Sequence, residues 1–224
     1  MTAGAPRALR LAHRGDWRVA PENSLAAMAA ALAVPTCDGL EFDVRGSADG
    51  VPVLLHDATL ERVQGLDARV GDLTAAELGR HGIPTLADVL AAAGSDPFLD
   101  VELKGMPVPA VIDVLEAARG PRLKHAVVSS FDADALEWLG RQRPGWQRWL
   151  NAMSLAEPWL RTARELGCAA LSVRWTAIDE AGTAAARAAG LGVAAWTVRD
   201  AAAARQLDAM GVMAICVEAE ALDA

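Results

Sequence analysis

WQRWLNAMSLAEPWLRTARELGCAALSVR, residues 146–174, carries two apolar runs of strand length with a helix-like segment between them. The runs are residues 146–151 and 169–174. Apolar residues recur at helical spacing between them, at Trp159, Leu160, Ala163 and Leu166, and Gly167 follows at a predicted C-cap. A strand, a helix and a second strand in this order are typical of a parallel sheet covered by helices.

The same alternation extends almost from one end of the chain to the other. Apolar or β-branched runs of strand length occur at residues 8–13, 39–44, 51–56, 98–103, 125–130, 146–151, 169–174, 193–198 and 212–217. Repeated strand–helix alternation predicts an α/β fold, either a (β/α)8 barrel or a doubly wound sheet. No linker rich in Pro, Gly or Ser divides the chain, so we expect a single domain over residues 1–224.

One connection does not fit a parallel sheet. Only residues 45–50 separate Val44 from Val51, whereas a parallel crossover needs about a dozen residues or more. Ala48-Asp49-Gly50 signals a turn, so the two runs form either a hairpin or an irregular short crossover. The following segment, residues 59–82, is polar and carries Gly65, Gly71 and Gly79 in its interior, and we interpret it as an excursion above the barrel, a candidate lid or substrate-facing loop.

Composition and charge exclude several classes of protein. The chain of 224 residues has 53% hydrophobic residues, enough for a sizeable core, but no run of the roughly 20 apolar residues that a membrane span needs. A net charge of −8 argues against a nucleic-acid partner, because phosphate backbones bind basic faces. Three widely spaced cysteines, Cys37, Cys168 and Cys216, suit neither a disulfide framework nor a zinc ribbon. Together with the absence of a secretory h-region, they predict a soluble cytoplasmic protein without stable membrane insertion.

Polar residues close several of the apolar runs, where a strand–helix barrel has its active site. Alternation along a strand places Glu41 and Asp43 on one face, and likewise Glu102 and Lys104. Three converging carboxylates form a hard, oxygen-rich site suited to Mg²⁺ or Ca²⁺ rather than zinc. A lone E-x-D pattern is more often a surface charge or a salt bridge, but here it occurs together with two histidines that also end strands.

The two histidines that close early apolar runs are His13 and His56. Beside a metal they suit general acid and general base work on a phosphodiester, because imidazole titrates near neutrality. A single such histidine is more often a core or capping residue. His81 and His125 lack this setting and are interpreted as surface or core histidines. Arg14 and Lys104 would supply positive charge to a phosphate. We expect these side chains to come from the first four barrel strands and to meet around one cation.

The order and spacing of these residues resemble a known family. The matching strings are His13-Arg14-Gly15, Pro21-Glu22-Asn23-Ser24, Glu41-Phe42-Asp43-Val44, Asp49-Gly50, His56-Asp57, Ile83-Pro84-Thr85-Leu86, Val101-Glu102-Leu103-Lys104, Ser129-Ser130-Phe131 and Trp196-Thr197-Val198. They look like the motifs of the glycerophosphodiester phosphodiesterase family and span nearly the whole chain.

The resemblance implies a (β/α)8 TIM barrel and an enzyme of glycerol and lipid metabolism. It implies one divalent cation on Glu41, Asp43 and Glu102, and catalysis by His13 and His56. Phosphate contact would come from Arg14 and Lys104, and Trp196 would lie near the substrate. Which histidine is the acid and which the base stays open, as do the choice between Mg²⁺ and Ca²⁺, the alcohol group recognised and the oligomeric state.

The chain departs from the family pattern at Glu218, where an aspartate is usual, so that Glu218 either replaces it at the rim or the role is lost. The expected reaction is hydrolysis of a glycerophosphodiester, such as glycerophosphocholine, to glycerol 3-phosphate and an alcohol. One alternative is lysophospholipase D-like action, which would need an apolar groove. Another is a catalytically silent binding module, which would be expected to lose a histidine or a metal carboxylate; all these positions are filled here.

Overall fold

The computed structural model describes residues 7–224, so the first six residues of the predicted 1–224 domain lie outside the described part. Within residues 7–224 eight parallel strands close into a barrel, because β1 pairs with β9 on one side and with β2 on the other. The barrel strands are β1 (Leu9–His13), β2 (Gly39–Gly46), β4 (Phe98–Leu103), β5 (Ala126–Ser130), β6 (Arg148–Ala152), β7 (Ala170–Arg174), β8 (Gly192–Val198) and β9 (Ala214–Val217). The predicted (β/α)8 barrel is confirmed.

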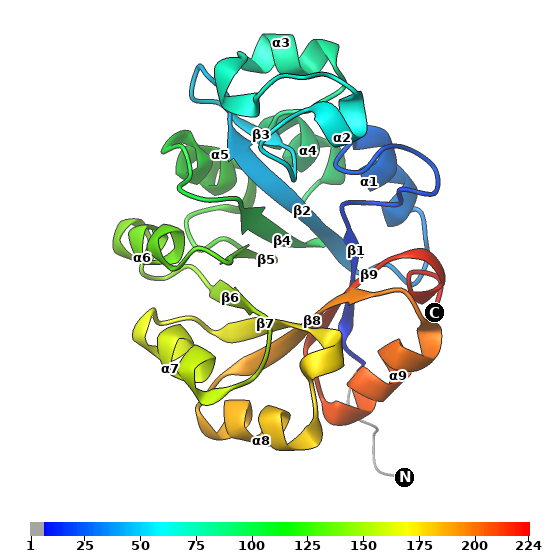
Figure 1. Ribbon diagram of the computed structural model, residues 1–224, viewed down its shortest axis with the longest axis vertical. Helices are drawn as coiled ribbons and strands as arrows, with labels where there is room; N and C mark the ends of the chain where they lie inside the picture. The colour runs from blue at the N-terminus through cyan, green and yellow to red at the C-terminus, as the bar shows by residue number, and fades with distance from the viewer. Residues whose placement is uncertain (1–6) are drawn as a thin grey trace.

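A ring of helices surrounds the barrel, as Figure 1 shows looking along the barrel. The ring consists of α1 (Leu25–Leu32), α4 (Leu86–Ala93), α5 (Ala110–Arg119), α6 (Ala133–Gln142), α7 (Glu157–Glu165), α8 (Glu180–Ala188) and α9 (Ala201–Met210). Side-chain caps define several of their starts. Ser24 accepts a hydrogen bond from the Ala27 amide at 3.2 Å, and Asp200 accepts one from the Ala203 amide at 2.8 Å.

The short connection after β2 is a hairpin. Strand β3 (Pro52–Leu54) runs antiparallel to the end of β2, with Val44 opposite Leu54 and Gly46 opposite Pro52. Gly50 closes the turn at φ +75°, and its amide donates to the Ser47 carbonyl at 3.0 Å. Strand β3 is therefore outside the barrel. The expectation that His56 ends a barrel strand is wrong, because this residue follows the hairpin arm.

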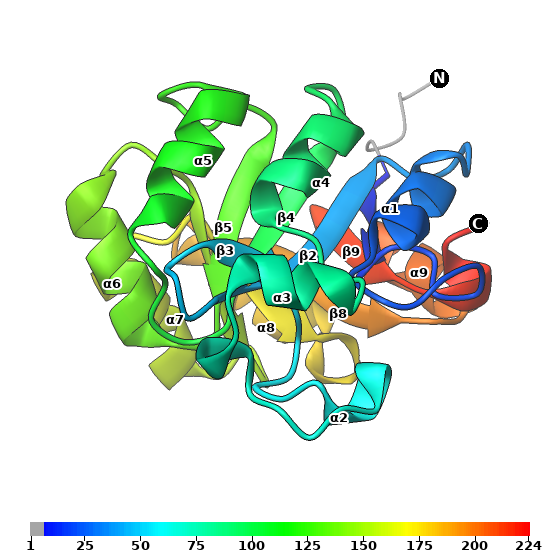
Figure 2. The ribbon, with the colours of Figure 1, turned by 90° about the horizontal axis from the view of Figure 1, so that it is seen from above.

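The segment at residues 59–82 forms a small packed unit rather than an open loop. It contains α2 (Glu61–Gln64), the 3-10 turn η1 (Val70–Asp72) and α3 (Ala75–Arg80). Its apolar side chains pack on those of the hairpin in a separate cluster of Val53, Leu55, Leu60, Val70, Leu78 and Ile83. In Figure 2 α2 lies at the lower edge of the molecule, away from α4 and α5 at the upper edge. In the sequence the apolar residues of this cluster are separated by polar neighbours, which is why the sequence alone suggested a loop.

Inward-facing positions of the barrel change from apolar to polar along the same strands. The lower part of the interior is an apolar plug formed by Leu11, Val127, Trp149, Ala170, Ala194, Ala214 and Cys216. Two residues further along, the inward position is His13 on β1, Ser129 on β5, Asn151 on β6 and Ser172 on β7. The plug closes the barrel from below, so that polar side chains at the carboxyl ends of the strands face a cavity with one mouth.

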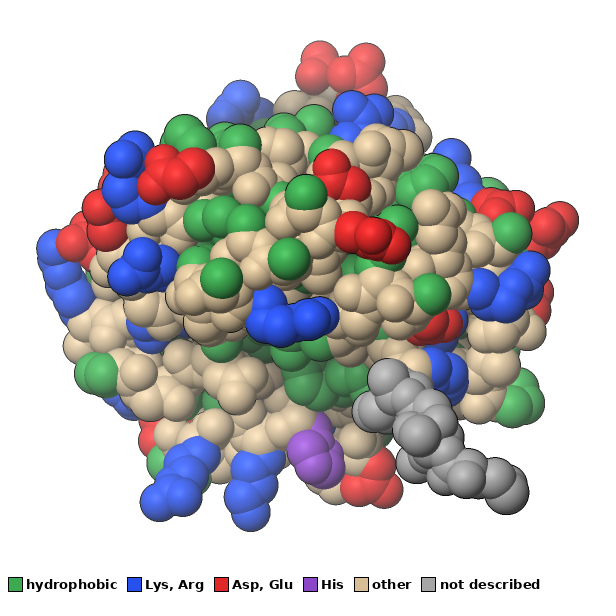
Figure 3. All heavy atoms as spheres, turned by 90° about the horizontal axis from the view of Figure 1, so that it is seen from below, with side chains coloured by type: hydrophobic (Ala, Val, Ile, Leu, Met, Phe, Trp, Pro, Cys, Tyr) green, Lys and Arg blue, Asp and Glu red, His purple; other side chains and the backbone are tan. Residues whose placement is uncertain are grey.

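None of the helices between residues 7 and 224 combines the length and the apolar character required to cross a bilayer. On the face shown in Figure 3, acidic and basic side chains are interspersed among the other side chains and do not gather into a basic patch.

Candidate active site

Adjacent strands β2 and β4 bring the three predicted metal carboxylates together. The strands pair in parallel, with Glu41 opposite Asp100 and Asp43 opposite Glu102. Ligand atoms of Glu41, Asp43 and Glu102 all lie within 4.8 Å of one another, and all three residues are buried. Because side chains alternate along each strand, this cluster follows directly from the parallel register of β2 and β4.

The charge balance of this cluster fits a bound cation. Glu41 is 3% exposed, and neither of its carboxylate oxygens has a hydrogen-bond partner among the described residues. Burial raises the pKa of Glu41 well above its usual range, and the charges of Asp43 and Glu102 raise it further. Burial would also raise the pKa of Asp43, but Lys104 and Arg14 lower it to about 2. A hard divalent cation would give the Glu41 oxygens the partner that the protein does not provide.

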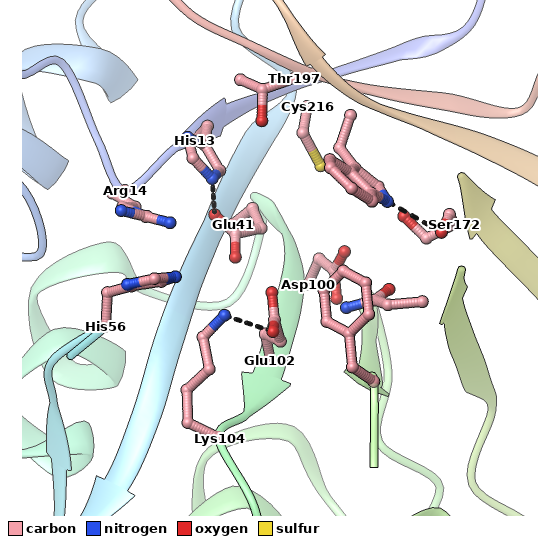
Figure 4. A pocket seen from close by; sticks show the side chains of 13 residues that line it. His13, Arg14, Glu41, His56, Asp100, Glu102, Lys104, Ser172, Thr197 and Cys216 are labelled. Carbon is pink, nitrogen blue, oxygen red and sulfur yellow. Dashed lines mark hydrogen bonds and ion pairs between the residues drawn. The ribbon is translucent and has the colours of Figure 1, made fainter. Parts of the chain in front are cut away.

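Each histidine is held by a carboxylate at Nδ1. His13, at the end of β1, contacts Glu218 Oε1 through Nδ1 at 2.5 Å, and its Nε2 lies 3.7 Å from Glu41 Oε2. His56 contacts Asp57 Oδ1 through Nδ1 at 2.6 Å. Figure 4 shows both rings on the side of the cavity where Arg14 also lies. A carboxylate at Nδ1 fixes the ring orientation and leaves Nε2 for chemistry in the cavity.

Glu218 lies at the rim where the family pattern has an aspartate. It contacts His13 on one oxygen, and Arg199 Nε donates to its other oxygen at 2.7 Å. Burial would raise its pKa, but the hydrogen bond with His13 and the neighbouring Arg199 lower the pKa to about 2. Glu218 is therefore a carboxylate in direct contact with the first histidine.

The two predicted phosphate-binding cations lie against the carboxylates of the cluster. Arg14 Nε is 3.0 Å from Asp43 Oδ2, and Lys104 Nζ is 2.9 Å from Asp43 Oδ1 and also contacts Glu102. Burial would lower the pKa of Lys104, but Asp43 and Glu102 raise it, so the ammonium stays charged. Asn23, which the chemistry predicted from the sequence did not include, donates to Asp43 Oδ2 at 2.8 Å.

Trp196 lies at the far side of the same cavity. Its ring is edge-on to Phe131 at a centroid distance of 5.5 Å, and its Nε1 donates to the Ser172 carbonyl at 2.9 Å. The cavity measures about 220 Å³ and is lined by the predicted residues His13, Arg14, Glu41, His56, Glu102, Lys104 and Trp196, together with Asp100, Phe131, Asn151, Ser172, Thr197 and Cys216. Asp43 lies beneath this lining, fully buried.

Arg45 is a positioning residue that the sequence reasoning missed. Its Nε and Nη2 both donate to the His56 carbonyl, at 2.9 and 2.7 Å, and its Nη1 donates to the Lys104 carbonyl at 3.4 Å. Arg45 thus joins the hairpin arm to the end of β4. Alternation along β2 places Arg45 on the same face as Glu41 and Asp43, and this could have drawn attention to it. Its guanidinium, however, binds main-chain carbonyls, and no sequence pattern reveals such contacts.

Replacing Arg45 by methionine is expected to lower kcat of phosphodiester hydrolysis about tenfold with little change in KM, because His56 loses its anchor and shifts from a productive position. Arg45→Lys should recover part of the loss, since an ammonium can still donate to the His56 carbonyl. The two variants are compared with the wild type in steady-state kinetics. Equal kcat in Arg45→Met and wild type would show that the hairpin holds His56 without this side chain.

Comparison with known proteins decides the family. The description of the matching family model is "Glycerophosphoryl diester phosphodiesterase family", and the match covers residues 13–219. The chain belongs to this family. The family resemblance and the enzyme class predicted from the sequence, a phosphodiesterase acting on glycerophosphodiesters, are confirmed.

Relatives of known sequence and structure agree with the family. A glycerophosphodiester phosphodiesterase of Caldanaerobacter subterraneus subsp. tengcongensis is 30% identical over 172 residues, which cover 68% of this chain and 70% of that protein. The glycerophosphodiester phosphodiesterase of Thermotoga maritima has 25% identity and a TM-score of 0.83, covering 98% of this chain and 97% of that one. An Oleispira antarctica phosphodiesterase, solved with the product sn-glycerol-3-phosphate, has 28% identity and a TM-score of 0.76. The match covers 95% of this chain and 92% of that one.

Proposed function

We propose that this chain hydrolyses a glycerophosphodiester to glycerol 3-phosphate and an alcohol, with one divalent cation, Mg²⁺ or Ca²⁺, held by Glu41, Asp43 and Glu102. The observation that supports this most is that two histidines, an arginine, a lysine and unpartnered carboxylate oxygens surround one cavity of about 220 Å³. The product bound to the Oleispira antarctica relative supports the same substrate class. The predicted cytoplasmic location and the 1–224 domain limits stay predictions.

The positions of the side chains support the following roles. Arg14 and Lys104 would bind the non-bridging oxygens of the phosphate, Arg14 through its planar fork and Lys104 as a point charge. One of His13 and His56 would take a proton from the attacking water, and the other would give a proton to the leaving alkoxide, so that a P–O bond to water replaces the P–O bond to the alcohol. Trp196 would contact the substrate from the opposite wall. When bound, the cation supplies further positive charge to the phosphate oxygens.

A chelation experiment tests this proposal. After dialysis against a chelator, the protein is expected to release no glycerol 3-phosphate from glycerophosphocholine or glycerophosphoethanolamine, and Mg²⁺ or Ca²⁺ should restore release. Enzymatic detection of glycerol 3-phosphate measures both steps. Activity that persists after chelation would contradict the proposed dependence on a cation. Absence of turnover on every diester, with cation bound, would favour a catalytically silent binding module. Turnover only on lysophospholipids would favour the lysophospholipase D-like alternative.

A further inference from the structure

Three charged side chains outside the cavity are joined by a single guanidinium. Arg62, on the short helix α2, donates from Nη1 and Nη2 to the two carboxylate oxygens of Glu22 at 2.9 and 2.7 Å. Its Nε donates to Asp57 Oδ2 at 2.5 Å. Glu22 lies in the loop between β1 and α1, whereas Asp57 follows the hairpin arm. We call Glu22, Arg62 and Asp57 the charged bridge, because they connect two separate segments of the chain.

Each end of the charged bridge contacts a residue of the proposed reaction. Glu22 Oε1 accepts a hydrogen bond from Arg14 Nη1 at 3.0 Å. At the other end, Asp57 Oδ1 contacts His56 Nδ1 at 2.6 Å, through the oxygen that Arg62 does not use. Figure 4 shows Arg14 and His56 at the same edge of the cavity. The residues of the bridge do not themselves line the cavity, so they can act on the reaction only through these two neighbours.

His56 depends on such support more than His13 does. Strand β3 ends before His56, and the imidazole is 35% exposed, against 15% for that of His13. Arg45 binds only the main-chain carbonyl of His56, which leaves the ring free to turn. The ring is held by Asp57, and the other side-chain partner of Asp57 within residues 7–224 is Arg62. Without Arg62, the partly exposed Asp57 could turn towards solvent and release the ring.

The bridge also balances charge beside Arg14. Burial would raise the pKa of Glu22, but the hydrogen bond with Arg62 and the charge of Arg14 lower it, so Glu22 is ionised at neutral pH. If Arg62 were absent, Glu22 would pair with Arg14 alone and would compete with a phosphate for the same guanidinium. Arg62 therefore satisfies Glu22 and leaves Arg14 available to an anionic substrate.

We propose that Arg62 is a positioning residue, which orients the His56 ring through Asp57 and keeps Arg14 available to the phosphate through Glu22. This inference rests on the proposed function and adds a residue that lies outside the cavity. It also gives a role to the packed unit of residues 59–82. That unit does not line the cavity, and it acts on the reaction through one side chain of α2.

Two substitutions of Arg62 test the two ends of the bridge. Arg62→Met is expected to lower kcat on glycerophosphocholine about tenfold, because the His56 ring loses its orientation. It should also raise KM about fivefold, because Glu22 then competes for Arg14. Arg62→Lys keeps the charge but lacks the planar fork that binds two carboxylates, so KM should return close to the wild-type value while kcat stays low. Steady-state kinetics with cation present measure both constants.

A second background separates positioning from a general effect on the fold. His56→Ala has no ring to orient, so adding Arg62→Met to it should change its residual kcat by less than about twofold and should still raise KM. A structural role would lower kcat by the same factor in both backgrounds. Arg62→Met should melt within about 2 °C of wild type, because ion pairs of exposed side chains contribute little to stability. Arg80→Met changes an exposed arginine of α3 in the same unit, and this control should keep both wild-type constants.

Several outcomes overturn the role of Arg62. Equal kcat in Arg62→Met and wild type would show that Asp57 orients His56 unaided, and it would leave the proposed hydrolysis intact. An equal loss of kcat in the wild-type and His56→Ala backgrounds would also contradict it. If Arg62→Lys recovered kcat but not KM, the two ends of the bridge would not have the roles assigned to them. A wild type that turns over no diester with cation present would remove the proposed function itself and the role of Arg62 with it.

Discussion

In the proposed cation site, Glu41→Gln is expected to reduce glycerophosphodiester turnover by about a thousandfold, because loss of one anionic ligand weakens cation binding. The phosphate then loses several kcal/mol of transition-state stabilisation by the cation's positive charge. Glutamine has nearly the same shape, so the fold of β2 should not change. Turnover is measured over a range of Mg²⁺ and Ca²⁺ concentrations. Glu116→Gln is a matched control, because Glu116 forms an ion pair with Arg143 at 2.7 Å on the outer helices, away from the cavity.

Without cation, Glu41→Gln should leave the stability of the fold unchanged or raise it, in contrast to its effect on turnover. Glu41 is buried beside Asp43 and Glu102 with no hydrogen-bond partner in the described part of the chain, so the cation-free wild type carries the cost of these crowded carboxylates. Cation at about 100 times its Kd should stabilise the wild type by about 2.7 kcal/mol. Glu41→Gln should melt at the same or a higher temperature without cation and gain little from it. A variant with undiminished cation stabilisation would exclude Glu41 as a ligand.

His13→Ala and His56→Ala are each expected to lose roughly 10²- to 10⁴-fold in kcat on glycerophosphocholine, because each removes a proton-transfer group. The two variants should differ on a diester with a nitrophenol leaving group. Nitrophenolate leaves without a proton, so the variant that lacks the general acid should recover most of its activity. The variant that lacks the general base should not recover.

This comparison assigns the two roles, which neither the sequence nor the geometry distinguishes. Both rings have a carboxylate at Nδ1, Glu218 for His13 and Asp57 for His56, so the surroundings are similar in kind. His125→Ala is the control, because His125 is exposed at the amino-terminal end of the barrel strands and should be kinetically silent. Recovery of both variants, or of neither, would contradict a division into one acid and one base.

Much of the site could be predicted because its residues lie two apart on adjacent strands. The E-x-D of β2 and the E-x-K of β4 are each on one face by alternation alone. Their adjacency in the barrel requires the run between them to form a hairpin arm, which the structure shows. The same rule applied to positions 100, 151 and 172 would have found Asp100, Asn151 and Ser172, which also line the cavity.

The sequence by itself determined the repeated strand–helix units and the identity of the charged residues at the strand ends, since these depend on periodicity and local order. The family resemblance, and not the periodicity, selected the barrel over the doubly wound sheet. Only the tertiary structure decided that β3 is a hairpin arm outside the barrel, that Arg45 anchors His56 and that Glu218 contacts His13 from β9. These contacts join residues far apart in the chain, or bind a side chain to a main-chain carbonyl. They depend on how the barrel closes, and local sequence patterns do not encode that closure.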